Sequence, residues 1–296
     1  MDPVATLSDG VDRASVEPTR VDDRPAILEL RDLRFSYGGG IDVLDGVSLS
    51  IQTGGIVGIV GPSGCGKSTL LSLVAGLSTP TSGTIARRRV DPSRHPLSMV
   101  FQKDTVLPWL TVADNVRLFA KFKRHRARPG LGGLRKRSGG QPLDDRVAEL
   151  LTIGGLSDRA DAYPYQLSGG MRRRLAFLTA VAADPEVLLL DEPFSSVDEP
   201  TRVGIHQDVF RIARMMNMSA MLVTHDLAEA ITLCDRVVIL SNRPARIATS
   251  YEIPFGEERQ MLELRETKQY LELYGHLWHD LSQQIAAGHK ASEAAR

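Results

Sequence analysis

The feature that most constrains the fold is a short apolar run, Ile56–Val60, that leads directly into a glycine-rich loop. This loop fits the pattern G-x-x-x-x-G-K-[S/T] and consists of Gly61, Pro62, Ser63, Gly64, Cys65, Gly66, Lys67, Ser68 and Thr69. An unbroken apolar run of this length is typical of a strand buried on both faces. The glycines let successive backbone N–H groups turn inward at the start of a helix, which makes an anion site. We therefore predict an α/β sheet that carries a phosphate-binding loop, residues 61–69.

Polar residues within this loop and directly after a second apolar run have the chemistry that nucleotide hydrolysis requires. Within the loop, Lys67 can reach the β- and γ-phosphates and Ser68 can ligate Mg²⁺. A second apolar run, 187–190, ends in Asp191 and Glu192. Asp191 is expected to hold a water of the Mg²⁺ shell, and Glu192 to orient and deprotonate the attacking water. Acids also follow strands simply because strands end at the surface, but the phosphate loop favours the catalytic interpretation.

A third motif is the segment Ser168, Gly169, Gly170 and Met171, which precedes a helical run. A serine and two glycines at a helix start form another anion site by the same backbone and dipole effects. The same three residues are also ordinary in loops, so this motif alone is weak.

Composition excludes several classes of protein. The 296 residues carry 36 Lys and Arg against 36 Asp and Glu, which argues against binding to nucleic acid or membrane through bulk charge. Cys65 and Cys234 do not make a disulfide framework. No apolar run approaches the roughly 18 residues of a membrane span, and the N-terminus lacks the features of a signal peptide. We expect a cytosolic protein whose membrane role, if any, comes through a partner.

The remaining patterns outline the chain. Residues 1–25 are expected to form a flexible tail, and alternating residues between 27 and 51 predict antiparallel strands. Thr111 with Asp114 predicts the start of a helix, and helical patterns recur at 144–153 and 171–182. Strands are predicted at 97–101, 187–190, 220–223 and 236–240, and an amphipathic C-terminal helix by Tyr270, Leu273, Leu277, Leu281 and Ile285. We expect this helix to pack on the core; pairing between copies and regulation are its alternatives.

The order of the motifs resembles that of ATP-binding cassette ATPases throughout roughly residues 26–250. The phosphate loop, Gln102 after a strand, the Leu-Ser-Gly-Gly segment, the Asp191-Glu192 pair, the segment 195–198 and His225 after a strand occur in the family's order. The resemblance implies a P-loop NTPase core with a mixed sheet, an antiparallel β subdomain and an inserted α-helical subdomain at about 103–182. Residues 251–296 would form a helical C-terminal extension.

The resemblance also implies roles for individual residues. Tyr37 resembles the aromatic residue that stacks on adenine, and Gln102 the residue that senses Mg²⁺ and the attacking water. Asp198 resembles the acid that communicates across a dimer, and His225 the residue that contacts the γ-phosphate. ATP would bind to the phosphate loop of one copy and to Ser168, Gly169 and Gly170 of a second copy or an equivalent subunit. Mg²⁺ would be held by Ser68, Gln102 and Asp191.

Two features depart from the family pattern. Met171 stands where the family commonly has glutamine, which predicts tuned rather than lost activity. The Arg-rich stretch 124–142 reads as a longer connection than usual. It is expected to be a solvated loop, with contact to anionic lipid or an acidic partner as the alternative.

The segments 101–115 and 241–247 resemble the ATPase subunits of bacterial importers of nitrate, sulfonate, taurine and similar small compounds. The implied partners are an integral membrane permease and, indirectly, a substrate-binding protein, with the chain peripheral on the cytoplasmic side of the inner membrane. Leu107, Trp109 and Leu110 would form an apolar patch that receives the permease, unless Trp109 is buried core. The rivals are an exporter ATPase, a soluble ATPase acting on nucleic acid, and an ATP-dependent regulator. No nucleic acid partner is expected.

Overall fold

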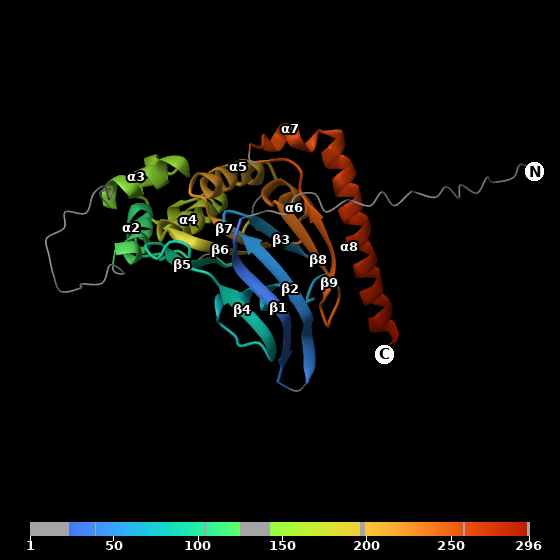
Figure 1. Cartoon of the computed structure of the whole chain (residues 1–296). Coiled ribbons are helices and arrows are strands. Elements are labelled where there is room, and N and C mark those ends of the chain that lie inside the picture. Colours follow the sequence, from blue (N-terminus) through green and yellow to red (C-terminus); the bar gives the residue numbers. More distant parts are fainter. Residues whose placement is uncertain are drawn as a thin grey trace, which may run out of the picture.

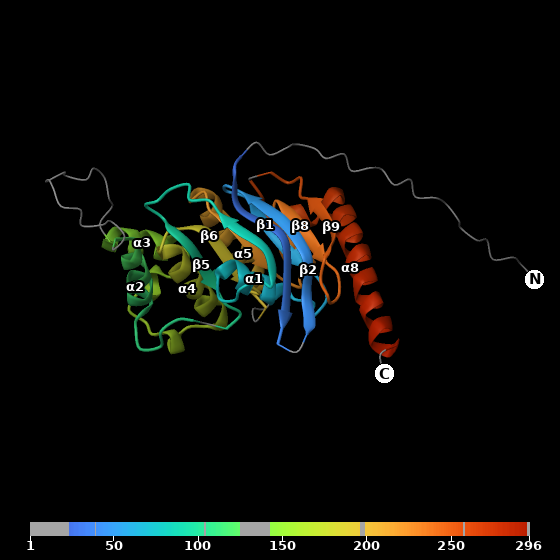
Figure 2. The ribbon, with the colours of Figure 1, turned by 60° about the horizontal axis from the view of Figure 1, so that its bottom comes forward.

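The computed structural model describes residues 24–38, 40–103, 105–124, 143–195, 199–256 and 258–294 (Figure 1). The predicted tail, up to residue 23, and the predicted basic loop, from residue 125, lie outside these ranges. Within them, a mixed sheet forms the centre of the molecule, an antiparallel sheet covers part of one face, and helices lie at both ends (Figures 1 and 2).

The mixed sheet has, among the described residues, six strands in the order β5-β6-β7-β3-β8-β9. The first five are parallel and β9 is antiparallel to β8. Their bounds are β3 Ile56–Val60, β5 His95–Val100, β6 Pro185–Asp191, β7 Ser219–Val223, β8 Arg236–Leu240 and β9 Ile247–Glu252. The prediction of strands at 97–101, 187–190, 220–223 and 236–240 is confirmed, except that Phe101 follows β5 rather than ending it. β9 was not predicted, because its residues alternate only between half-buried and exposed.

The second sheet pairs β1 (Ala26–Tyr37) with β2 (Ile41–Gln52) and with β4 (Ser82–Arg87), in the order β2-β1-β4. All pairs are antiparallel, with Leu30 opposite Leu49 and Leu28 opposite Ile51. The predicted antiparallel strands are therefore confirmed. β4 is mostly exposed, so its sequence lacks the apolar alternation that would have revealed it.

Alternation along the central strands builds two separate hydrophobic cores. Leu188 and Leu190 of β6 face one core, which also contains residues of α4, α5, α6 and α8. Val187 and Leu189 of the same strand face the other core, between the antiparallel sheet and α1. Because side chains of a strand point to opposite faces in turn, an all-apolar strand fits only a sheet that is covered on both faces.

The helices fall into three groups. α1 (Lys67–Ala75) follows the phosphate loop; α2 (Val112–Arg124), α3 (Leu143–Ile153) and α4 (Gly169–Ala182) lie together at one end (Figures 1 and 2). The others are α5 (Glu199–Met215), α6 (Leu227–Leu233), α7 (Met261–Arg265) and α8 (Lys268–Ala294), with short 3₁₀ turns at Ser157–Arg159 and Pro164–Gln166. Thr111 caps α2 as predicted, since its Oγ1 accepts from Asp114 N at 3.1 Å. α4 begins two residues before its predicted start because Ser168 caps it.

The C-terminal helix α8 packs on the core, as expected from its apolar stripe. Tyr270, Leu277 and Leu281 are buried, and Leu273 and Ile285 pack against the same core. α8 lies beside β8 and β9 in both ribbon views (Figures 1 and 2). The Tyr251 hydroxyl of β9 donates to Asp280 at 2.7 Å, which fixes the helix against this edge strand.

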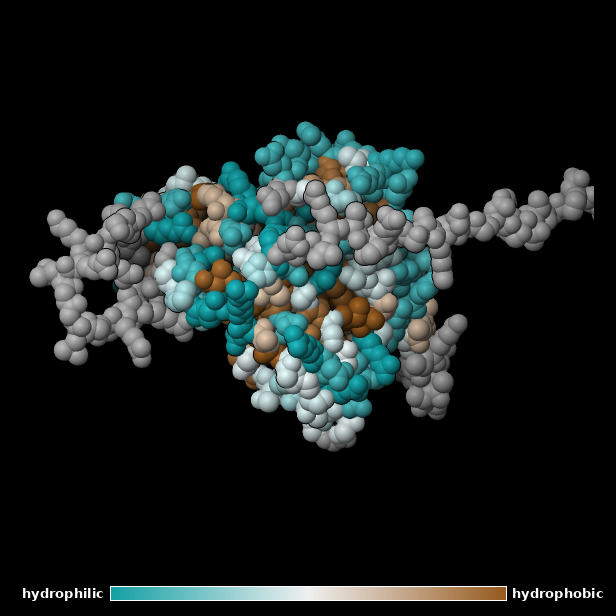
Figure 3. All heavy atoms as spheres, viewed as in Figure 1, coloured by the Kyte–Doolittle hydropathy of each residue, from teal (hydrophilic) through white to brown (hydrophobic). Residues whose placement is uncertain are grey.

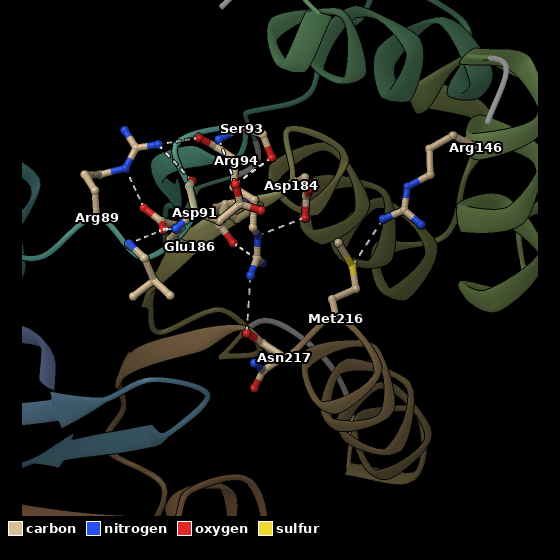
Figure 4. Close-up of polar contacts among 11 residues, drawn as sticks. Arg89, Asp91, Ser93, Arg94, Arg146, Asp184, Glu186, Met216 and Asn217 are labelled. Carbon is tan, nitrogen blue, oxygen red and sulfur yellow. Dashed lines mark hydrogen bonds and ion pairs between the residues drawn. The ribbon is translucent and has the colours of Figure 1, made fainter. Parts of the chain in front are cut away.

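A polar network ties the connection after β4 to the start of β6 (Figure 4). The Glu186 carboxylate is buried, accepts a hydrogen bond from Val90 N at 2.7 Å and lies 2.6 Å from Arg89 Nε. The guanidinium of Arg94 pairs with Asp184 at 3.2 Å and donates to Pro185 O at 2.6 Å. The connection between β4 and β5 has no regular structure and is thus held by these side-chain hydrogen bonds and ion pairs rather than by pairing with a strand.

Glu186→Ala should lower the free energy of unfolding by about 1–3 kcal/mol, because the backbone N–H groups of Val90 and Asp91 both lose their buried acceptor. Urea denaturation monitored by circular dichroism measures this loss. Glu29→Ala is the matched control, since Glu29 forms an ion pair with the exposed Arg31 and such pairs contribute about 0–1 kcal/mol. Equal effects of the two variants would contradict the structural role of Glu186.

Hydrophilic residues cover most of the face shown in Figure 3, with small hydrophobic areas near α7 and over the antiparallel sheet. In the described part of the chain, no helix has the length and apolar character needed to cross a bilayer.

Candidate active site

The predicted catalytic residues meet at one edge of the mixed sheet. β3, β5, β6 and β7 are parallel, so the loops that follow them leave at the same edge. The phosphate loop follows β3, Gln102 follows β5, Glu192 follows β6 and His225 follows β7.

The phosphate loop has the geometry that its glycines predict. Gly66 has φ +124° as the residue before α1, and a Cβ there would lie 2.9 Å from Val43 Cγ1. Lys67 is buried, and its Nζ donates to Gly61 O at 2.8 Å and to Pro62 O at 3.0 Å. The ammonium group is thus held over the loop at the N-terminus of α1, where phosphate oxygens are favoured. Burial raises the pKa of the Cys65 thiol. Because the thiol is less reactive than the thiolate, we interpret Cys65 as a small packing residue of the loop.

Ser68, Asp191 and Tyr37 lie around the start of α1. Ser68 Oγ donates to Asp191 Oδ1 at 3.0 Å, so two of the three predicted metal ligands are in direct contact. Burial raises the pKa of Asp191, and the hydrogen bond from Ser68 opposes that shift. The half-exposed Tyr37 ring packs edge-on against Phe35, and its hydroxyl lies 3.2 Å from Thr69 Oγ1. The Tyr37 side chain therefore reaches the start of α1 through its hydroxyl, and its stacking on adenine stays a prediction.

Two other predicted catalytic residues, Gln102 and His225, contact Glu192. Gln102 Nε2 donates to Glu192 Oε2 at 3.2 Å, and His225 Nδ1 lies 3.3 Å from the same oxygen. Glu192 has φ +43°, a region that residues with a Cβ rarely adopt. Its N–H donates to Val223 O at 2.8 Å, which holds this strained turn against β7. Such strain is typical of functional sites.

A buried acid that the sequence reasoning missed supports the His225 turn. Thr224 Oγ1 donates to Glu229 Oε2 at 2.5 Å and accepts from Asp226 N at 3.0 Å. Burial raises the pKa of Glu229 to about 8, so this carboxyl is mainly protonated at pH 7. The other side of the turn is fixed by Thr224 N, which donates to Ile59 O of β3 at 3.2 Å. His225 is therefore placed relative to the phosphate-loop strand.

The Ser168 segment stands apart from these groups. Ser168 Oγ accepts from Met171 N at 3.3 Å, and Ser168 and Gly169 are exposed at the start of α4. Among the described hydrogen bonds, none joins residues 168–171 to the phosphate loop or to Glu192. Asp198 lies outside the described residues. The predicted second anion site is therefore exposed at the start of α4.

A further residue that the sequence reasoning missed is Arg173 of α4, which is buried and donates to Phe101 O and Gln102 O. Arg173 stands four residues before the buried Phe177 and eight before the buried Val181. That helical spacing could have predicted its burial.

These features together define a P-loop ATPase: a parallel sheet whose strand ends bring together a phosphate loop, an Asp-Glu pair and a histidine. A sequence model described as "ABC transporter" matches residues 44–195. The chain therefore belongs to the ABC transporter family and is an ATPase of that family.

Curated relatives are similar over most of the chain. An aliphatic sulfonates import ATP-binding protein, SsuB 1 of Mesorhizobium japonicum, is 40% identical over 81% of this chain and 87% of its own length. The taurine import ATP-binding protein TauB of Jannaschia sp. is 34% identical over 90% of this chain and 98% of its own. The nitrate import ATP-binding protein NrtC of Synechococcus elongatus is 39% identical over 84% of this chain, which spans 37% of that protein.

Solved structures give the same fold. The dimeric structure of MJ0796, described as a bacterial ABC transporter cassette, matches with a TM-score of 0.62 and 28% identity. The match covers 77% of this chain and 100% of that cassette. A second structure of MJ0796, in a post-hydrolysis state bound to ADP and Pi, matches with a TM-score of 0.61. The predicted fold class is thus confirmed.

Proposed function

We propose that this ATPase drives import of a small compound of the nitrate, sulfonate or taurine kind through a separate membrane permease. The observation that carries the proposal is the match to import ATP-binding proteins over nearly their whole length, 87% for the sulfonate protein and 98% for the taurine protein. The subunit itself would sit at the cytoplasmic surface of the inner membrane, bound to the permease. Its substrate would be selected by the permease and by a substrate-binding protein.

In the proposed hydrolysis step, Glu192 accepts a proton from the attacking water. His225 and Gln102, which both contact Glu192 Oε2, orient this carboxylate and contact the γ-phosphate and the water. Lys67 moves its hydrogen bonds from the loop carbonyls to the β- and γ-phosphates and stabilises the transferred charge. Tyr37 stacks on the adenine.

The donor set around Ser68 fits Mg²⁺. Ser68, Asp191 and Gln102 offer hydroxyl, carboxylate and amide oxygens, which are hard ligands. In the described part of the chain, no group of three or more His, Cys, Asp or Glu side chains could hold a metal by itself. That suits an ion bound mainly by phosphate oxygens and water, with a single carboxylate, Asp191, among its three proposed protein ligands. When bound, Mg²⁺ neutralises charge on the phosphates, while Asp191 and Ser68 keep it in place.

The proposed active unit is a dimer in which ATP lies between two copies. The exposed Ser168 segment of one copy would cover the phosphate loop of the other. This arrangement would give the start of α4, which is exposed in the single chain, a phosphate group to bind. Closure on ATP and opening after hydrolysis would move the attached permease. The dimeric cassette of MJ0796 supports this arrangement.

The proposed permease contact is the patch Leu107, Trp109 and Leu110. Trp109 is 69% exposed, and Leu107 and Leu110 are half-buried. The buried Asn115 of α2 holds this turn: its Oδ1 accepts from Leu107 N at 2.8 Å, and its Nδ2 donates to Leu107 O and Leu110 O, each at 3.1 Å. An exposed indole on a fixed turn is a suitable anchor for a partner helix.

Trp109→Ala should weaken association with the permease by about 30-fold, since truncation of a central interface tryptophan costs about 2 kcal/mol or more. Co-purification with the permease and ATP-driven uptake into vesicles measure the loss. Trp278→Ala is the matched control, because Trp278 is also exposed but lies on α8. Unchanged uptake and co-purification in Trp109→Ala would show that the patch is not the contact.

The test of the function as a whole is a pull-down of tagged protein from its native membranes with MgATP, followed by mass spectrometry. Recovery of an integral permease together with a substrate-binding protein supports import, and the binding protein indicates the substrate. A membrane partner without a binding protein would favour export. Ribosomal or DNA-repair components would overturn the transport proposal.

A further inference from the structure

The buried guanidinium of Arg173 joins α4 to the segment that carries Gln102. Arg173 is 3% exposed, and its Nη1 donates to Phe101 O at 3.2 Å while its Nη2 donates to Gln102 O. The planar fork of arginine thus meets two consecutive carbonyl groups, which fixes the orientation of that backbone more tightly than a single donor could.

The described residues between β5, which ends at Val100, and α2, which begins at Val112, form no strand or helix. Their backbone is held by a turn, in which Leu110 N donates to Leu107 O at 3.2 Å, and by side chains. Its far end, at residues 107–111, is bound by Asn115. Its near end, at Phe101 and Gln102, is bound by Arg173.

This near end reaches the catalytic group directly. The Gln102 side chain donates to Glu192, while its carbonyl accepts from Arg173. At the other end of the connection, Arg173 lies in the second turn of α4, four residues after Gly169 at the helix start. If α4 is displaced, we expect the guanidinium group of Arg173 to carry the Gln102 backbone with it.

We propose that Arg173 is a positioning residue that holds Gln102 against Glu192 and makes the start of α4 move together with Gln102. The inference rests on the proposed function. In the proposed dimer, Gln102 serves the ATP on its own phosphate loop, while Ser168 of the same chain covers the ATP of the partner. Arg173 then connects the two nucleotide sites within each copy.

A double-mutant cycle in the full-length protein tests the action through Gln102. Arg173→Gln should lower kcat for ATP about tenfold or more and leave KM within about twofold. In a Gln102→Ala background, the same substitution should change kcat by less than about twofold, because its target is already lost. Arg173→Lys should recover part of the rate by keeping a charged donor. Equal factors in both backgrounds would reject the proposal.

Fluorescence tests the same proposal without using activity. The chain has two tryptophans, so Phe101→Trp in a background where Trp109 and Trp278 are replaced by phenylalanine places a single emission probe on the backbone that Arg173 binds. Arg173→Gln should lower the fluorescence anisotropy of this probe, and Arg173→Lys should lower it by less. Arg174→Gln is the matched control, since Arg174 is the next residue of α4 and pairs with Asp208 of α5 at 3.5 Å. Unchanged anisotropy in the Arg173 variants would overturn the inference.

The outcomes separate the two proposals. If the unaltered chain fails to hydrolyse ATP, the proposed function fails, and the anisotropy still decides whether Arg173 holds the segment. If hydrolysis is normal and the cycle is additive, only the role of Arg173 is rejected.

Discussion

Replacing Glu192 by glutamine should lower ATP turnover by about 10²- to 10⁴-fold, the usual contribution of a positioned general base. Glutamine has nearly the same shape, but its amide cannot take a proton from water. The phosphate loop, Lys67 and the Ser68–Asp191 pair are untouched, so ATP binding should persist. The variant should therefore accumulate the ATP-bound dimer.

Phosphate release measures the turnover, binding of a fluorescent ATP analogue measures the affinity, and size-exclusion chromatography with MgATP measures the dimer. Glu149→Gln is the control, because it removes a carboxylate that pairs with Arg146 on α3. Hydrolysis at the parent rate in Glu192→Gln would disprove the assignment of the base. Equal losses in both variants would point to a general effect of charge.

The sequence predicted those site residues that lie in contiguous motifs. Residues 61–69 and the pair Asp191-Glu192 each follow an apolar strand, and parallel strands bring their ends to one edge of the sheet. The contact of Ser68 with Asp191 follows from this geometry, although 123 residues separate them in the chain.

What could not be predicted are contacts that depend on tertiary packing. The buried Glu229 beneath Thr224, whose pKa burial raises, is one example, because nothing in its local pattern distinguishes it from an exposed acid at a helix start. Asn115 is another: a single buried amide satisfies a whole turn, and its partners are known only once α2 is in place. β4 and β9 were missed because neither buries a full face.

The exposure of Trp109 also required the structure. The apolar residues around it fit either a buried core or an exposed patch. In the structure the indole is exposed, on a turn whose backbone is hydrogen-bonded to the buried Asn115. The apolar pattern alone does not reveal these hydrogen bonds.

Lys67→Ala should weaken ATP binding itself, the step that Glu192→Gln leaves intact. A charged hydrogen bond contributes about 1.5 to 3 kcal/mol, so ATP affinity should fall by about 10- to 150-fold. Lys67 is buried over the phosphate loop, so neither a neighbouring side chain nor water can replace its charge between the phosphates. Hydrolysis should fall further than affinity, since Lys67 also stabilises charge that moves during the transfer.

Isothermal titration with ATP and phosphate release measure the two losses, and Lys121→Ala, which removes an exposed ammonium on α2, is the control. A thermal melt separates lost binding from lost folding, because Lys67 donates only to two carbonyls of its own loop in the described structure. Combining Lys67→Ala with Glu192→Gln should abolish the ATP-dependent dimer that Glu192→Gln accumulates. A dimer that persists in the double variant would mean that association does not require phosphate held by Lys67.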